Sequence, residues 1–184
     1  MSTSSNRATP LPRDERRAAI LATFVPLLIE RGPSVTTKQI ADAAGVAEGT
    51  IFKAFADKDD LISAAVDAVT DPTSVEQALA AIDPTLDREA QLEEAVALLQ
   101  RRIVEIWRVH EMLPHHAPKQ RPSIEASPGL VAIFSAHRDR IGVEPAVAAQ
   151  RLRAIALALT HPLLFDEPAT PAEIVHQFLH GVSA

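Results

Sequence analysis

The sequence predicts an all-α protein with about nine helices. Apolar residues recur at a spacing near 3.6 from end to end, whereas the alternation typical of a half-buried strand is absent over any useful length. Gly32-Pro33 and Asp71-Pro72 are stop signals that divide this pattern into helical segments. With 184 residues and no cysteine, the chain can bury an ordinary core without disulfides or thiolate metal sites.

Residues 1–12 are predicted to form a disordered arm, because Ser, Thr, Asn and two prolines dominate them. This polar start lacks the apolar centre of a signal peptide, and no later run approaches the roughly 18 apolar residues of a membrane span. We therefore expect a cytoplasmic protein without a membrane partner.

The first helix is predicted from about Arg13 to Arg31. Pro26 inside it removes one backbone hydrogen bond and should bend the axis. One face of this helix is apolar and comprises Ile20, Leu21, Phe24, Leu27 and Leu28.

The stretch from Val35 to Phe55 predicts two short helices joined by a tight turn, a helix-turn-helix. Thr36 stands three residues before Gln39 and can form a capping box with it. Gly45 suits the left-handed conformation that ends a helix. A second helix from about Glu48 to Phe55 follows. A generic pair of helices is the alternative, although it would not require this combination of residues.

A connector helix is predicted to begin near Asp57, whose carboxylate can cap the amide of Asp60, and to run to Asp71. Beyond it the spacing predicts helices at 74–82, 86–112, 129–141, 145–164 and 171–182, with a proline-rich loop at 113–128. We thus expect a helix-turn-helix domain at 13–56, a connector at 57–71 and a helical domain for ligand binding and dimerisation at 72–184.

The formal net charge of −6 hides an uneven distribution. Residues 1–58 contain eight Lys and Arg against six Asp and Glu, whereas residues 59–184 contain ten against eighteen. Only the amino-terminal part can therefore favour a phosphate backbone.

Between about Arg16 and Leu61 the chain resembles the TetR family of bacterial transcriptional regulators. The resembling pieces are I-L at 20–21, R-G at 31–32, Thr36, I-A-D-A-A-G-V at 40–46, G-T-I-F at 49–52, Phe55 and D-K-D-D-L at 57–61. The remainder is similar only in its number of helices. The resemblance implies a homodimeric repressor with a three-helix DNA-binding head. Its helical body would bind a small-molecule effector that releases the protein from a palindromic double-stranded DNA operator.

Helix positions and the resemblance together predict the DNA-binding residues, with Thr50 and Lys53 in the groove and others at phosphates. The set is Thr36, Thr37, Lys38, Glu48, Gly49, Thr50, Phe52, Lys53 and Lys58. Each lysine is alternatively a solvated charge. The chain departs from the family pattern in having Ala47 for a capping serine, Phe52 for a tyrosine and Ala54 for a larger aromatic or histidine.

The helices at 145–164 and 171–182 are predicted to pair with those of a second copy as a four-helix bundle. The expected dimer interface is Leu152, Ile155, Leu159, Leu163, Ile174, Val175, Phe178 and Val182. Packing within one chain is the alternative, because buried and interface helices share the same pattern.

An effector pocket is predicted between the helices at 86–112 and 129–141. Its expected lining is Trp107, His110, Met112, Phe134 and His137, which would give an apolar cavity with two imidazoles. Plain core packing is the alternative.

No cofactor or metal is expected. His176 and His180 stand four apart, a spacing that can bind zinc or nickel, but no third ligand is fixed beside them in sequence. The chain lacks a cysteine nucleophile, a glycine-rich phosphate loop and an HExxH motif, so we do not expect an enzyme. The other class of function is a helical small-molecule or protein-binding module with weakened DNA reading, suggested by Ala47, Phe52 and Ala54.

Overall fold

The computed structural model describes residues 12–113, 115–116 and 127–181. Within these residues the chain forms nine α-helices and two 3-10 helices without a strand, which confirms the predicted fold class. The predicted arm, most of the proline-rich loop and Val182 lie outside the described residues. None of the described helices is long and apolar enough to cross a membrane.

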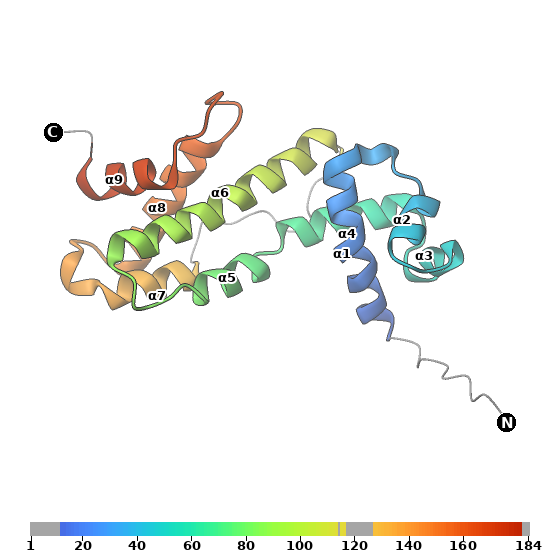
Figure 1. Cartoon of the computed structure of the whole chain (residues 1–184), viewed down its shortest axis with the longest axis horizontal. Helices are drawn as coiled ribbons and strands as arrows, with labels where there is room; N and C mark the ends of the chain where they lie inside the picture. Colours follow the sequence, from blue (N-terminus) through green and yellow to red (C-terminus); the bar gives the residue numbers. More distant parts are fainter. Residues whose placement is uncertain (1–11, 114, 117–126, 182–184) are drawn as a thin grey trace.

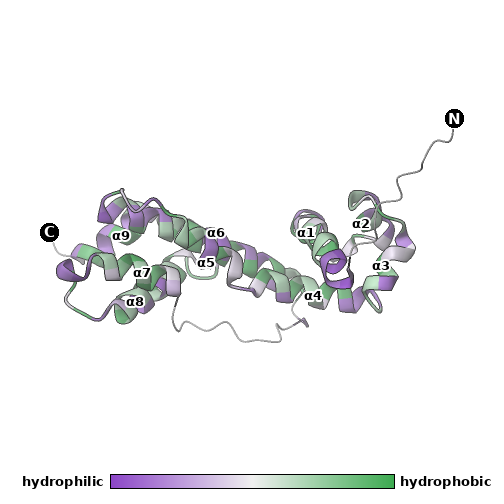
Figure 2. Cartoon of the chain, turned by 90° about the horizontal axis from the view of Figure 1, so that it is seen from below, coloured by the Kyte–Doolittle hydropathy of each residue, from purple (hydrophilic) through white to green (hydrophobic). Residues whose placement is uncertain are grey.

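Four helices and a 3-10 turn build one end of the molecule, which we call the head. They are α1 (Arg13–Arg31), η1 (Gly32–Ser34), α2 (Thr37–Ala43), α3 (Glu48–Ala54) and α4 (Lys58–Thr70). The remaining elements form the body. They are α5 (Thr73–Ala80), α6 (Arg88–Met112), α7 (Pro128–Ala136), η2 (Arg138–Arg140), α8 (Pro145–Thr160) and α9 (Pro171–His180). Two views at right angles show α2 and α3 at one end and α7, α8 and α9 at the other (Figures 1 and 2).

Two predicted helices end several residues earlier than expected. The helix predicted at 145–164 ends at Thr160, because His161 precedes Pro162 and adopts an extended backbone. The helix predicted at 129–141 ends at Ala136, where His137 leaves the helical region and the chain continues as η2. Inside α1, Pro26 is exposed and the helix continues through it.

The long helix α6 belongs to two hydrophobic cores. Near its start, Leu92, Val96 and Leu99 are buried in the body core with residues of α5, α7, α8 and α9. Near its end, Val109 is buried in the head core with residues of α1 to α4. A helix of 25 residues is roughly 37 Å long, enough to reach both cores. Both hydrophobic and hydrophilic residues occur along these helices (Figure 2), as expected for helices with one buried side.

Polar contacts fix the body helices at two further points. Arg102 of α6 donates from Nη2 to the Thr70 carbonyl at the end of α4, at 2.7 Å. Glu76 of α5 accepts hydrogen bonds from Ser127 Oγ at 2.7 Å and from Gly129 N at 2.9 Å. A side chain at Gly129 would come within 2.6 Å of Leu79 Cβ, so the close approach of α5 and α7 requires glycine.

Candidate nucleic-acid interface

The two short helices α2 and α3 form the predicted helix-turn-helix. At the start of α2, the Thr36 hydroxyl accepts from Gln39 N at 3.2 Å, and Gln39 Oε1 accepts from Thr36 N at 2.9 Å, which completes a capping box. In the turn, Gly45 has a φ of +65°, a conformation that side chains rarely adopt. The Val46 amide donates to the Ala41 carbonyl at 3.0 Å and closes the turn.

One side of α3 is anchored in the head core. Ile51 and Ala54 are buried there, and so is Phe55 directly after the helix. Because these residues occupy the inner side, the rest of α3 faces away from the protein. The sequence comparison with the family treats Ala54 as part of the surface that reads DNA. In the structure its side chain is only 1% exposed, so Ala54 itself offers no side-chain group to DNA.

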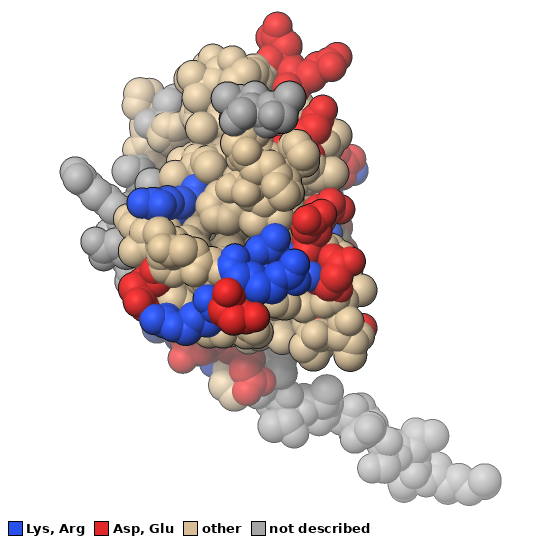
Figure 3. Space-filling view, turned by 90° about the vertical axis from the view of Figure 1, so that its left-hand side faces the viewer, with Lys and Arg blue, Asp and Glu red and all other residues tan. Residues whose placement is uncertain are grey.

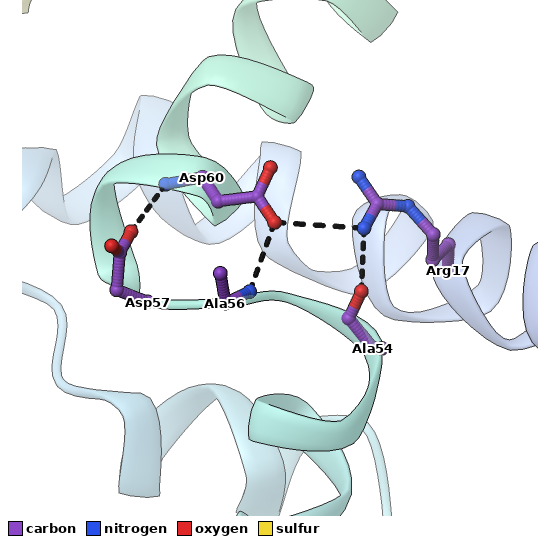
Figure 4. Close-up of polar contacts among 5 residues, drawn as sticks. All are labelled: Arg17, Ala54, Ala56, Asp57 and Asp60. Carbon is purple, nitrogen blue, oxygen red and sulfur yellow. Dashed lines mark hydrogen bonds and ion pairs between the residues drawn. The ribbon is translucent and has the colours of Figure 1, made fainter.

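The recognition helix α3 has no side-chain cap at its first end, since Ala47 occupies the N-cap position. Arg17 of α1 holds its other end. The guanidinium donates from Nη1 to the Ala54 carbonyl at 2.5 Å (Figure 4). It also lies 4.2 Å from the centre of the Phe55 ring. A cation at this position complements the partial negative charge at a helix C-terminus.

Arg17 also reaches the start of the connector helix α4. Its Nη1 lies 3.7 Å from Asp60 Oδ2, and the same oxygen accepts a hydrogen bond from Ala56 N at 2.9 Å (Figure 4). The Asp57 carboxylate in turn accepts from Asp60 N at 2.8 Å and caps α4, as the sequence predicted. Three helices therefore meet at one cluster of charged groups.

A second contact joins the two helices of the motif on their exposed side. Thr37 Oγ1 of α2 donates to Glu48 Oε1 of α3 at 2.5 Å. Both residues were predicted to bind DNA separately, but the structure places them against each other. The Glu48 carboxylate at the first turn of α3 also complements the helix dipole, in the absence of a cap at Ala47.

The other predicted DNA-binding residues also lie on the head. Thr36, Lys38, Gly49, Phe52 and Lys53 are exposed, whereas Thr50 and Lys58 are half-buried. Lys58 Nζ donates to the Pro33 carbonyl at 2.8 Å, which leaves two further N–H groups on its ammonium. Arg17 was not among the predicted residues, because its partner Ala54 lies 37 positions away and a backbone carbonyl gives no sequence signal.

The five residues predicted to line an effector pocket are divided between different parts of the protein. Phe134 is fully buried in the body core, where its ring lies 5.7 Å from that of Phe178. Met112 packs against the head core instead. Trp107 lies 6.1 Å from His110, which is exposed, and 4.3 Å edge-on from His161. Met112 and Phe134 thus pack with different hydrophobic cores of the described residues, and an effector pocket lined by all five side chains stays a prediction.

His137, the fifth of these residues, lies at the end of α7, and its Nε2 is enclosed without a hydrogen-bond partner among the described residues. Near it along the chain, a shallow hollow of about 390 Å³ is lined by Arg138, Ile141, Gly142, Val143 and Glu144, none of them predicted for the pocket.

Three residues predicted for a dimer interface are buried within one chain. Leu152, Ile174 and Val175 are at most 2% exposed and belong to the body core, because α8 and α9 pack on α6 and α7 with these faces. They are therefore not available to a second copy in this fold. Ile155, Leu159 and Phe178 are half-buried at the margin of that core, and Leu163 is exposed.

At the body end of the molecule, basic and acidic groups lie side by side. On the face in Figure 3, basic side chains lie beside acidic ones rather than forming a separate patch. Arg138 and Glu144 illustrate this pairing, with two hydrogen bonds of 2.8 Å between them. The Arg138 guanidinium lowers the pKa of the Glu144 carboxyl. Such paired charges do not favour a polyanion.

The histidine pair of α9 lies on one side of the helix. The ring centres of His176 and His180 are 4.9 Å apart, and His180 Nε2 lies 3.8 Å from Glu89 Oε1. The described residues nevertheless hold no group of three or more His, Cys, Asp or Glu side chains arranged to bind a metal ion.

Comparison with known proteins places the helix-turn-helix in a family. Residues 20–65 match the family model described as bacterial regulatory proteins, tetR family. The HTH-type transcriptional repressor Rv3405c of Mycobacterium tuberculosis is 38% identical over 65 residues. This similarity spans 35% of this chain and 35% of the relative, so about two thirds of each lie outside it.

Solved structures extend the similarity of fold to the body. A TetR-family regulator of Mesorhizobium loti has a TM-score of 0.62 at 17% identity, covering 94% of this chain and 96% of that one. The TetR-like regulator LfrR of Mycobacterium smegmatis, solved in complex with proflavine, has a TM-score of 0.51 at 20% identity, covering 94% and 98%. The family match confirms the predicted helix-turn-helix, and these structures confirm the predicted all-α fold. Residues 20–65 of this chain thus match the helix-turn-helix of the TetR family of bacterial regulatory proteins, within a fold that is similar over the whole chain to solved regulators of that family.

Proposed function

We propose that the protein is a ligand-responsive repressor that binds a double-stranded DNA operator as a homodimer and is released by a small-molecule effector. The proposal of DNA binding rests on the way in which α3 is held against the rest of the head. Its inner side is buried, Arg17 and Thr37 hold its two ends, and its outer side is exposed. A short helix held in this way can enter a major groove without rearrangement.

The contacts in this proposal divide between bases and phosphates. Lys53 and Glu48 on the exposed side of α3 face the groove. Lys38 on α2 and the remaining N–H groups of Lys58 bind phosphates and fix the position of the head. None of the described residues accepts a hydrogen bond from Lys38 or Lys53, so binding DNA would not disrupt an existing contact of either lysine.

DNA binding is tested by selecting duplexes from a random library with the full chain and measuring their affinity by fluorescence anisotropy at several salt concentrations. Lys53→Ala should weaken binding to the selected duplex by about 1–3 kcal/mol. Lys38→Ala should weaken all duplexes alike and reduce the salt dependence. Arg151→Ala, an exposed cation of the body, is the matched control and should change neither.

Failure to select any sequence would overturn the repressor proposal. Weak binding without sequence preference, together with tight binding of a small molecule, would instead support the helical binding module with weakened DNA reading. If Lys53→Ala and Arg151→Ala changed the affinity for DNA equally, Lys53 of α3 would not contact the bases.

The homodimer in this proposal follows from the small size of one head. Two heads about 34–36 Å apart would read the two halves of a pseudo-palindromic operator. Apolar side chains exposed after α8 support a contact with a second copy: Leu163 is 74%, Leu164 63% and Phe165 45% exposed. Together with Ile155, Leu159, Phe178 and the 37% exposed Leu157, they replace the buried residues of the sequence-based interface.

The dimer is tested by light scattering on the full chain. Leu163→Glu combined with Leu164→Glu should convert a dimer into a monomer, since both charges would be buried at the contact. Val143→Glu changes an exposed apolar residue away from this segment and serves as the control. A dimer that survives the double substitution would exclude this surface.

The effector part of the proposal places a small molecule in the body, within residues 72–184, and lets the connector at 57–71 carry the response. Similarity of fold to LfrR, solved with proflavine, supports a small-molecule site. Arg102 joins α6 to the end of α4 through the Thr70 carbonyl, so a shift of α6 would reach the head. The end of α6 also packs in the head core. Displacing α4 would change the separation of two heads and weaken operator binding.

This coupling is tested with proflavine as the first probe. Binding should raise the melting temperature of the protein and weaken its complex with the selected duplex. Arg102→Met should leave the first effect and reduce the second, since it removes the hydrogen bond from α6 to the end of α4. A ligand that stabilises the protein while leaving DNA affinity unchanged in the wild type would contradict the coupling.

A further inference from the structure

The exposed side of the recognition helix offers few chemical groups. Its exposed residues are Glu48, Gly49, Phe52 and Lys53. Glu48 provides acceptors, Lys53 provides donors and Gly49 provides only backbone. Phe52 is the single apolar side chain among these four residues.

Phe52 cannot turn into the protein. The residues on either side of it differ in environment, since Ile51 is buried in the head core and Lys53 is exposed. The inner side of α3 is already filled by Ile51, Ala54 and Phe55, each 1% exposed, whereas Phe52 is 51% exposed. About half of the Phe52 side chain is therefore exposed on α3, the helix that is proposed to bind DNA and that lies at the head end of the molecule (Figure 1).

The space next to this ring is open. Side chains of a helix lean toward its N-terminus, so Phe52 covers the turn that contains Gly49, three residues earlier. Gly49 has no side chain, and no atom lies within 4 Å of the position that a Cβ would take. A flat group can therefore approach the Phe52 ring from the side of Gly49.

We propose that Phe52 is a specificity-determining residue that packs on the 5-methyl group of a thymine in the major groove. This inference rests on the proposed DNA-binding function and extends it to the sequence that is read. The ring has no donor or acceptor, and the thymine methyl is the apolar group that base edges present in that groove. Each operator half-site would then contain a thymine at one fixed position opposite α3.

The experiment removes the methyl group from the DNA and the ring from the protein independently. Each thymine of a duplex selected by the full wild-type chain is replaced in turn by uracil, which keeps the hydrogen-bonding groups and lacks only the methyl. For the wild type, a single replacement at one particular thymine of a half-site should weaken binding about fourfold, the value expected for losing the burial of one methyl group. Replacing the other thymines should have little effect. For Phe52→Ala the thymine and uracil duplexes should bind equally.

Two matched variants separate this contact from general effects. Lys53→Ala should weaken both duplexes and keep the fourfold ratio between them, because its contact does not involve the methyl. Phe52→Leu keeps an apolar side chain and should retain part of the ratio. Melting curves of each variant check folding, and Phe52→Ala should stay folded with a melting temperature near that of the wild type, because the side chain is half exposed and lies outside the core.

The outcomes distinguish the two proposals. Sequence-specific binding in which no uracil replacement changes affinity would overturn the role of Phe52 and leave the repressor proposal intact. A ratio that persists in Phe52→Ala would overturn it as well, since another residue would then contact the methyl. Absence of any sequence-specific binding by the wild type would overturn both.

Discussion

Helices α2 and α3 are both seven residues long and adjacent in the chain, yet different interactions hold them. The start of α2 is capped by residues adjacent to it in the chain, through the capping box of Thr36 and Gln39. α3 begins at Ala47 without a cap and depends on Arg17 of α1 and Thr37 of α2. The helix that supports the motif is thus fixed locally, whereas the helix that would read DNA takes its position from the rest of the head.

This difference bears on the proposed regulation. A recognition helix held by Arg17 is also tied to Asp60 at the start of the connector helix α4. Movement of α4 can therefore change the position of α3 without unfolding it. A helix with a strong cap of its own would be less dependent on that contact.

The largest effect is expected from removing the remote support of α3. Arg17→Met removes a charge-assisted hydrogen bond to Ala54 and a cation–π contact with Phe55, which together should lower the free energy of unfolding by about 2 kcal/mol. Chemical denaturation followed by circular dichroism measures the change. Arg13→Met, an exposed arginine of the same helix, is the control. Equal losses for the two variants would show that α3 does not depend on Arg17.

The local support of α2 should be worth less. Thr36→Ala removes the capping hydroxyl and should cost about 1 kcal/mol in the same denaturation experiment. Ser74→Ala in the exposed first turn of α5 should have little effect. If Thr36→Ala cost as much as Arg17→Met, the distinction between local and remote support would not hold.

A cap can also be added where it is missing. Ala47→Ser provides an oxygen for the free amides at the start of α3 and should gain about 0.5–1 kcal/mol. Hydrogen exchange should show slower opening of α3, while Ala43→Ser at the end of α2 should bring no such protection. With the added cap, Arg17→Met should destabilise the protein less than it does in the wild type. If the free-energy changes of Ala47→Ser and Arg17→Met simply add in the double variant, the cap and Arg17 do not support α3 jointly.

The smallest effect concerns pH. Helix α9 begins with a capping box like that of α2, but it uses Glu173 in place of an amide. Hydrogen bonds from Thr170 lower the pKa of Glu173 in the folded protein, so this stabilisation is present above the ordinary carboxyl pKa of about 4.3 and is lost as the pH falls through the lowered value.

Glu173→Gln should therefore be less stable than the wild type at neutral pH, and the difference should shrink on acidification below about pH 4. Gln39→Ala in the capping box of α2 should lower the free energy of unfolding by the same amount at neutral and at acidic pH, because an amide does not titrate. Stability measured by denaturation across this range makes the comparison. A constant difference for Glu173→Gln would contradict the role of its charge.

The predicted helix boundaries were most accurate where neighbouring residues decide them. The start of α2 at Thr36, the turn at Gly45 and the cap of α4 at Asp57 all depend on contacts within a few residues. The end of α8 was predicted too late, although His161 before Pro162 carries a local signal for it. The early end of α7 at His137 has no comparable signal in the sequence.

Assignments that depend on distant partners were less accurate. The apolar pattern of Leu152, Ile174 and Val175 fits a dimer interface and a core equally well, and the structure places all three in the core. The supposed pocket residues Met112 and Phe134 each have a helical apolar position, yet they belong to different cores. Periodicity identifies the side of a helix that is buried without identifying what buries it.

The sequence by itself determined the all-α class, the helix-turn-helix and the surface on which DNA reading is proposed, because caps, turns and helical periodicity are local properties. Only the tertiary structure decided what holds α3 and which apolar faces remain exposed. Arg17 meets Ala54 across 37 positions, and Phe52 stays half exposed because Ile51 and Phe55 occupy the core. These outcomes depend on how the helices pack together, and contacts between distant segments leave no fixed spacing in the chain.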